Sequence, residues 1–161
     1  KDVQVGNTDS ERILHQIVDC VDNSQKDGIL DDDRLCKLIN DIICRLSKDN
    51  KLNLIVSNGQ ITFIHSNCRK SLYYLDKNDR IIVSTLALTD EDWIEVDLNT
   101  VYAIKDAKII YKGPAHDNEY VITEDDVDFI LNHLGDEAMN KLLASYGSIE
   151  NIKRQLSKTY K

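Results

Sequence analysis

The sequence lacks the features that would tie it to a membrane or to a nucleic acid. No apolar run approaches the roughly 18 to 20 residues of a membrane span, and no basic segment followed by an apolar one marks a signal peptide. Bases are also in the minority, because 20 lysines and arginines stand against 28 aspartates and glutamates, for a formal charge of −8. Nucleic acids and anionic membranes both attract basic surfaces, so we expect neither as the main partner.

Cysteine motifs for a metal are missing as well. The sequence contains neither a CxxC pair nor the Cys/His spacing of a zinc site. The four cysteines are Cys20, Cys36, Cys44 and Cys68. Their even number is compatible with two disulfides, but the first three stand in helical patterns beside apolar residues, where free cysteine behaves as a small hydrophobe. We therefore predict reduced cysteines in a cytoplasmic protein that holds no metal and no other cofactor.

The hydrophobic patterns predict helices, then hairpins, then helices again. Thr8 and Glu11 have the spacing of a capping box, and residues at helical spacing follow them and recur over 35–46. The apolar face of the first helix is expected to comprise Ile13, Leu14, Ile17, Val18 and Val21. From residue 52 the pattern becomes extended, and it turns helical again after Thr123. Three hairpin turns are expected, at Asn58-Gly59, Lys77-Asn78-Asp79 and Asp106-Ala107. This order predicts an α+β fold with an antiparallel sheet.

Several other residues that can carry chemistry are interpreted as structural. His15 stands within the first expected helix and is read as a half-buried or solvated histidine. His65 follows a strand, but no nucleophile and orienting group can be assembled around it from spacing. His116 belongs to a polar linker, because no second histidine lies at the spacing of a metal-ligating helix. Trp93, the single tryptophan, is expected to pack in a core.

The run VGNTDSE at residues 5–11 resembles the GxTDSE element of class II glutamine amidotransferases. The similarity continues in the same order through KLNLIVSNG at 51–59, SLYY at 71–74 and IVSTLAL at 82–88, and it reaches Trp93. The ordered series is more specific than any single piece of it.

This resemblance implies that residues 1–113 are the rear part of a glutamine amidotransferase type 2 domain, and that 114–161 are a C-terminal helical extension. The implied fold is part of a four-layer αββα Ntn-hydrolase sandwich. The implied reaction is hydrolysis of the glutamine side-chain amide by an N-terminal cysteine whose own α-amino group is the general base. Position 1 is Lys1, so the nucleophile, the oxyanion-hole asparagine-glycine pair and a substrate-binding arginine are expected upstream, and no catalytic residue is assigned here. Asn58-Gly59 is not that pair, because it comes too late in the order and sits in a hairpin turn.

One substrate contact carries over from the resemblance. Asp9 matches the family's aspartate that grips the α-ammonium group of glutamine, and a charge-assisted bond to an ammonium group is among the stronger contacts of a small ligand. From spacing alone Asp9 is merely a favourable acid in the first turn of a helix. The candidate substrate-binding set is Asp9 with Thr8, whose capping role would hold Asp9 in place, and Asn7, through its backbone.

The leading hypothesis is therefore a glutaminase of the class II amidotransferase type, inactive as the fragment in hand. Two alternatives stay open: a γ-glutamyl amide hydrolase of the same family, and a non-catalytic binding or assembly module that keeps the fold. The expected partners are glutamine or a γ-glutamyl compound and the missing N-terminal part of the same domain. A synthase that accepts ammonia, or a second copy of the chain, is a further expected partner.

Overall fold

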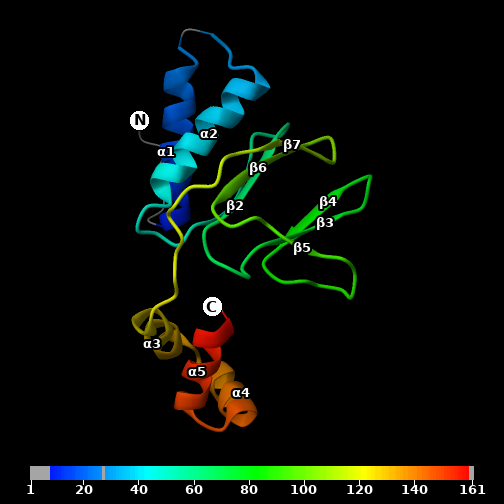
Figure 1. Ribbon diagram of the computed structural model, residues 1–161. Coiled ribbons are helices and arrows are strands. Elements are labelled where there is room, and N and C mark those ends of the chain that lie inside the picture. The colour runs from blue at the N-terminus through cyan, green and yellow to red at the C-terminus, as the bar shows by residue number, and fades with distance from the viewer. Residues whose placement is uncertain (1–7, 27, 160–161) are drawn as a thin grey trace.

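The computed structural model describes residues 8–26 and 28–159, and within them the chain is α+β with antiparallel sheets, as the patterns predict (Figure 1). The helices are α1 (Asp9–Ser24), α2 (Asp32–Leu46), α3 (Glu124–His133), α4 (Asp136–Tyr146) and α5 (Ile149–Thr159). The strands are β1 (Asn53–Ser57), β2 (Thr62–Ser66), β3 (Tyr73–Asp76), β4 (Ile81–Ser84), β5 (Ile94–Glu95), β6 (Thr100–Lys105) and β7 (Lys108–Lys112). In this part of the chain, no helix has the length and apolar character needed to cross a membrane.

The first two helices begin at side-chain caps, because the first amides of a helix have no partner inside it. Thr8 Oγ1 accepts from the Glu11 amide at 3.3 Å, and Asp31 accepts from the Arg34 amide at 2.8 Å. Most of the apolar stripe of α2 is buried as expected, with Leu38 and Leu46 partly buried at its margin. The prediction for α1 holds only in part, since Ile17 is buried but Leu14 and Val18 remain 47% and 43% exposed.

All three expected hairpins form. In the β6–β7 turn, Asp106 and Ala107 both have positive φ, the conformation that a two-residue hairpin with the twist of its strands requires. The β1–β2 connection differs from the prediction in detail. It is a four-residue loop in which only Gly59 has positive φ, while Asn58 Oδ1 accepts from the Gln60 and Ile61 amides.

The strands form two sheets, and with α1 and α2 they make three layers. Sheet A has the order β1-β2-β6-β7, and sheet B has the order β4-β3-β5. Successive side chains on a strand point to opposite faces. On β2, Phe63 accordingly packs in the core beneath α1 and α2, whereas Ile64 packs in a second core with Tyr102, Leu72 and Val96. The second core also takes in Tyr74 and Val83 of sheet B, so it lies between the two sheets. No described helix covers the far side of sheet B (Figure 1).

Trp93 does not pack in a core, contrary to the prediction. It is half-buried in the loop before β5, where its Nε1 donates to Thr89 Oγ1 at 3.1 Å. The indole N–H needs a polar partner, and this local hydroxyl supplies it without burial between the sheets.

Helices α3–α5 pack around their own small core of Val127, Leu131 and Ile152, below the sheets in Figure 1. Thr123 caps α3 as expected, in a full capping box with Asp126. A segment without regular structure, residues 114–120, leads from β7 to these helices; we call it the strap.

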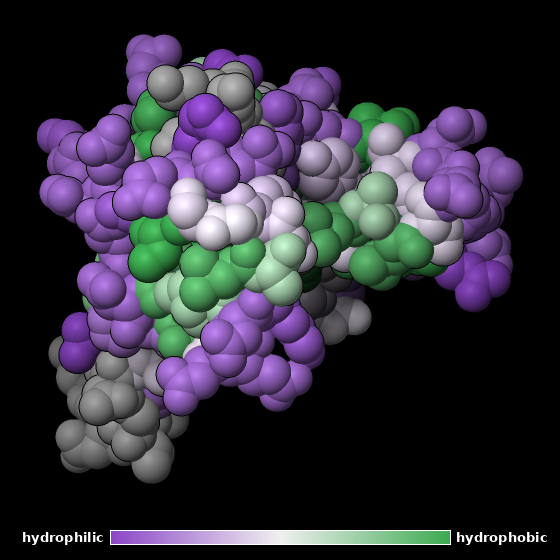
Figure 2. Space-filling model, turned by 90° about the horizontal axis from the view of Figure 1, so that it is seen from below, coloured by the Kyte–Doolittle hydropathy of each residue, from purple (hydrophilic) through white to green (hydrophobic). Residues whose placement is uncertain are grey.

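Apolar side chains also reach the surface. Large exposed ones include Leu86 and Leu88 in the loop before β5 and Phe129 on α3, each more than 60% exposed. Seen from below, apolar surface forms a band between polar regions (Figure 2). Apolar patches of this kind are typical of surfaces that contact another protein or segment.

The substitution Gly113→Ala is expected to lower the free energy of unfolding by about 1 to 2 kcal/mol, because overpacking displaces neighbours in a filled site. A Cβ at this position would lie 2.2 Å from Asn40 Oδ1, and Asn40 is buried on α2. Urea unfolding measures the effect. Gly135→Ala is the matched control, since nothing lies within 4 Å of its added Cβ. Equal effects of the two substitutions would contradict this account of Gly113.

Candidate functional site

The structure places two of the three candidate substrate-binding residues together at the start of α1. Thr8 is the N-cap, and Asp9 is the first residue of the helix, with its side chain exposed. Asn7 lies outside the described residues. The cap fixes the first turn of the helix, and the helix dipole favours a negative charge there. The geometry therefore leaves the Asp9 carboxylate open to an incoming cation.

A groove runs between α1 and the edge of sheet A, beginning at this end of the helix. It has a volume of about 450 Å³, and its walls are Ser10, Ile13, Leu14 and Ile17 of α1 and the residues 52–57. Ser10, which follows Asp9, lines it. Strand β1 pairs only with β2 among the described strands, so its outer edge carries backbone groups free to pair with a further strand.

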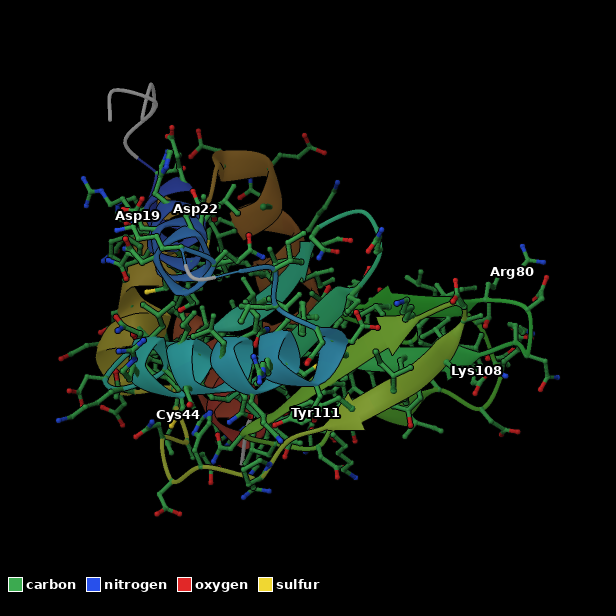
Figure 3. All side chains as sticks on the ribbon, turned by 90° about the horizontal axis from the view of Figure 1, so that it is seen from above. Asp19, Asp22, Cys44, Arg80, Lys108 and Tyr111 are labelled. Carbon is green, nitrogen blue, oxygen red and sulfur yellow. The ribbon has the colours of Figure 1, made fainter. Side chains whose placement is uncertain are left out.

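Other acids of α1 lie further along the helix. Asp19 and Asp22 are exposed near its C-terminal half (Figure 3). Neither belongs to the groove beside Ser10. They therefore offer matched controls for Asp9, with the same chemistry on the same helix.

The environments of the two buried thiols, Cys36 and Cys68, disfavour a role as nucleophile. Cys68 is 2% exposed, and burial raises the pKa of its thiol. Cys36 is equally buried, and its pKa is raised by burial and by nearby Asp32 and Asp33. A thiol attacks as the thiolate, so a raised pKa disfavours attack. All four cysteines are free, as predicted.

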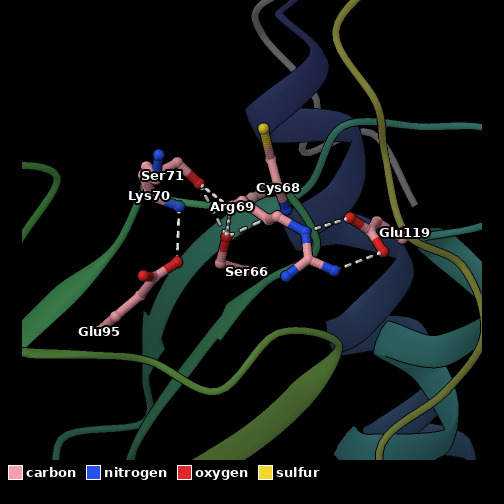
Figure 4. Close-up of polar contacts among 7 residues, drawn as sticks. All are labelled: Ser66, Cys68, Arg69, Lys70, Ser71, Glu95 and Glu119. Carbon is pink, nitrogen blue, oxygen red and sulfur yellow. Dashed lines mark hydrogen bonds and ion pairs between the residues drawn. The ribbon is translucent and has the colours of Figure 1, made fainter. Parts of the chain in front are cut away.

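A polar network closes the end of β2 around Cys68 (Figure 4). The Ser66 and Ser71 hydroxyls donate to Asn53 Oδ1 at 2.8 and 3.1 Å, and Asn53 Nδ2 donates to the Ser71 carbonyl at 3.1 Å. These bonds satisfy hydroxyl groups that are nearly buried. They fix Asn53, the first residue of β1, and hence one end of the groove wall.

Two more contacts in the same region join distant parts of the chain. The Arg69 guanidinium makes a two-pronged ion pair with Glu119 of the strap, at 2.7 and 3.2 Å. The Lys70 amide donates to the Glu95 carboxylate of β5 at 2.6 Å (Figure 4). The loop after β2 is thereby attached to sheet B on one side and to the strap on the other.

The structure also brings together two histidines that the sequence interpretation treated separately. His65 is fully buried on β2, and its Nε2 lies 3.0 Å from Nε2 of His116 in the strap. Burial lowers the pKa of His65 to about 4, with a smaller contribution from His116. Burial also lowers the pKa of His116. The two residues are 51 positions apart, and no local pattern signals the contact.

The buried His65 predicts that the protein loses stability in mild acid. The unfolded chain binds a proton with the ordinary pKa of 6.5, whereas folded His65 binds one only near pH 4. Between these values the unfolded state carries more protons, so the free energy of unfolding falls as the pH falls, by up to about 3 kcal/mol for a shift of this size. Urea unfolding at pH 7 and pH 5 measures the loss. The loss should shrink in His65→Gln and persist in His133→Gln, whose histidine is exposed on α3; an unchanged loss in His65→Gln would contradict the prediction.

Comparison with known proteins identifies the same family that the TDSE run and the strands after it resemble. The family model of class II glutamine amidotransferases matches residues 2–120, and the chain belongs to this family. Searches of curated proteins and of solved structures gave no match. The matched segment includes Thr8, Asp9, both walls of the groove and the strap, and it ends before α3.

Proposed function

We propose that the protein is a glutaminase of the class II amidotransferase type, in which Asp9 binds the α-ammonium group of glutamine. The observation that carries this proposal is the match to the family model, which covers the TDSE run. In the structure this run forms the start of a capped helix, and Asp9 is exposed there. The resemblance implies that Asp9 corresponds to the family's aspartate that binds the α-ammonium group of the substrate.

In the proposed reaction, the residues described here bind and orient the substrate. The Asp9 carboxylate accepts charge-assisted hydrogen bonds from the ammonium group, and the Thr8 cap holds the first turn in place. A cysteine at the mature N-terminus, supplied by a segment that precedes Lys1, attacks the side-chain amide. An oxyanion hole from the same segment stabilises the tetrahedral intermediate. Ammonia leaves, and water then releases glutamate from the thioester.

We further propose that the preceding segment completes a four-layer αββα sandwich. Two features support this. The outer edge of β1 has no strand partner among the described residues, and no described helix covers the far side of sheet B. An open edge and a bare sheet face are both features that proteins normally cover.

In this proposal residues 1–113 belong to the amidotransferase domain and 114–161 form a helical extension. The exposed apolar side chains of α3, such as Phe129, make the extension a candidate surface for a synthase that receives the ammonia, or for a second copy of the chain.

Steady-state assays on the natively produced, full-length protein test the substrate. Production of glutamate and ammonia from glutamine in equal amounts supports the glutaminase. Turnover of γ-glutamyl peptides with little turnover of glutamine would replace it by a γ-glutamyl amide hydrolase, because both substrates present the same glutamyl head to Asp9. No turnover of either would favour a binding module that keeps the fold.

A further inference from the structure

The imidazole pair of His65 and His116 ties the strap to sheet A. The ring centroids lie 5.2 Å apart with the planes tilted by 32°, and Nε2 faces Nε2 at 3.0 Å. One nitrogen of such a pair must donate and the other must accept.

The hydrogen bonds on either side of the pair decide where each proton lies. The backbone amide of Asn118 can only donate, and it donates to His116 Nδ1 at 3.1 Å. Neutral His116 therefore carries its proton on Nε2 and donates to His65 Nε2. His65 in turn carries its proton on Nδ1, which donates to the Leu52 carbonyl at 3.0 Å. The neutral pair thus uses all four ring nitrogens.

An added proton has no acceptor in this arrangement. On His65 Nε2 it would face the N–H of His116, and on His116 Nδ1 it would face the amide of Asn118. Either position replaces a hydrogen bond by two opposed donors, and an unmade hydrogen bond in a buried site costs free energy. Protonation is therefore compatible with these two rings only when they separate.

Separation would release the strap at the point where it crosses β2. The strap is held nearby by other bonds: the His116 amide donates to the Asn99 carbonyl at 3.1 Å, and the Tyr120 amide donates to the Asn67 carbonyl at 2.7 Å. These backbone bonds do not titrate, so they define the closed position without sensing pH.

We propose that the His65–His116 pair is a proton-sensitive latch, which fastens the strap to sheet A when neutral and frees the strap, with α3–α5 behind it, in mild acid. The latch does not depend on the proposed glutaminase. It makes the position of the helical extension relative to the sheets a function of pH.

The titratable and charged groups around the latch lie on the strands, loops and helices packed against the two histidines. Across β2, the neighbour of His65 on β6 is Val101, which does not titrate. The nearby charged and titratable side chains are Asp49 and Lys51 before β1, Cys44 on α2, Cys68 and Arg69 after β2, Asp117 and Glu119 in the strap, and Asp126 on α3. Asp117 raises the pKa of His116, but burial lowers it more.

Hydrogen exchange of the strap amides, read residue by residue at pH 7 and pH 5, tests the latch on the whole chain. After correction for the intrinsic pH dependence of exchange, the protection of the Asn118 and Tyr120 amides should fall by about 20-fold, as expected for a histidine with a pKa of about 4 when closed and 6.5 when open. Exchange of these strap amides should depend little on low concentrations of urea, whereas amides of β1, β2 and α2 that exchange by global unfolding should depend on it strongly, which separates release of the strap from global unfolding.

The variant His65→Gln should remove most of this pH dependence, because the pair then lacks the ring whose pKa is lowered to about 4, and glutamine cannot take up a proton. His15→Gln, a histidine on α1 beside Glu11, is the control and should leave it unchanged. Constant protection of the wild-type strap from pH 7 to pH 5, or the same fall in His65→Gln, would overturn the proposal. Nitrogen chemical shifts of the wild-type rings give an independent check: His65 protonated at Nε2 at neutral pH would also overturn it.

Discussion

Replacing Asp9 by asparagine in the natively produced protein is expected to lower kcat/KM for glutamine by about 10-fold to 100-fold, the range that a lost charge-assisted hydrogen bond supplies. Asparagine keeps the size of the side chain but removes the charge that would hold the ammonium group. The Thr8 cap is made by a different side chain, so stability should change little. Steady-state kinetics and urea unfolding of the same preparation separate the two effects.

Asp19→Asn is the matched control, since it is the same substitution at an exposed position of the same helix (Figure 3). It should leave kcat/KM unchanged. Kinetics of Asp9→Asn that cannot be told from those of Asp19→Asn would remove Asp9 from the substrate site, whatever the protein's activity.

Replacing Asn67 by alanine is expected to lower the free energy of unfolding by about 4 kcal/mol, because several buried groups would lose their partners at once. Asn67 is fully buried. Its Oδ1 accepts from the Leu52 amide at 2.7 Å, and its Nδ2 donates to the carbonyls of Asn50 and Asn118 at 2.7 and 2.9 Å. One amide thus joins the loop before β1, the end of β2 and the strap. Urea unfolding at pH 7 measures the loss.

Asn118→Ala provides the comparison, because that side chain donates one short hydrogen bond, to the Cys44 carbonyl at 2.8 Å. It should lower the free energy of unfolding by about 1 kcal/mol. Equal losses in the two variants would show that Asn67 is not the junction of these three segments.

The features that could be predicted from the sequence are those set by neighbours along the chain. The Thr8 cap depends on residues three apart, and the Asp106-Ala107 turn depends on the two strands that flank it. The α2 stripe is buried because its apolar residues share one face. Each of these signals lies within a few residues of the structure that it specifies.

The features that could not be predicted depend on what packs from elsewhere. Leu14 and Val18 have the same spacing as buried residues, but their exposure depends on which elements cover α1. The contact of His65 with His116 spans 51 positions and follows from the path of the strap after β7. Asp9 is a counterexample at the candidate site: its place at the helix start was predicted from the sequence, whereas its role in binding substrate comes from the family resemblance.

The most direct test of the proposed function is the intact mass of the natively produced protein before and after exposure to an electrophilic glutamine analogue such as a diazo-oxo-norleucine. The account predicts a chain that extends beyond Lys1, begins with cysteine and gains a single adduct at that cysteine. A native chain that starts at Lys1 and gains no adduct would contradict the glutaminase and leave a binding module built on the same fold.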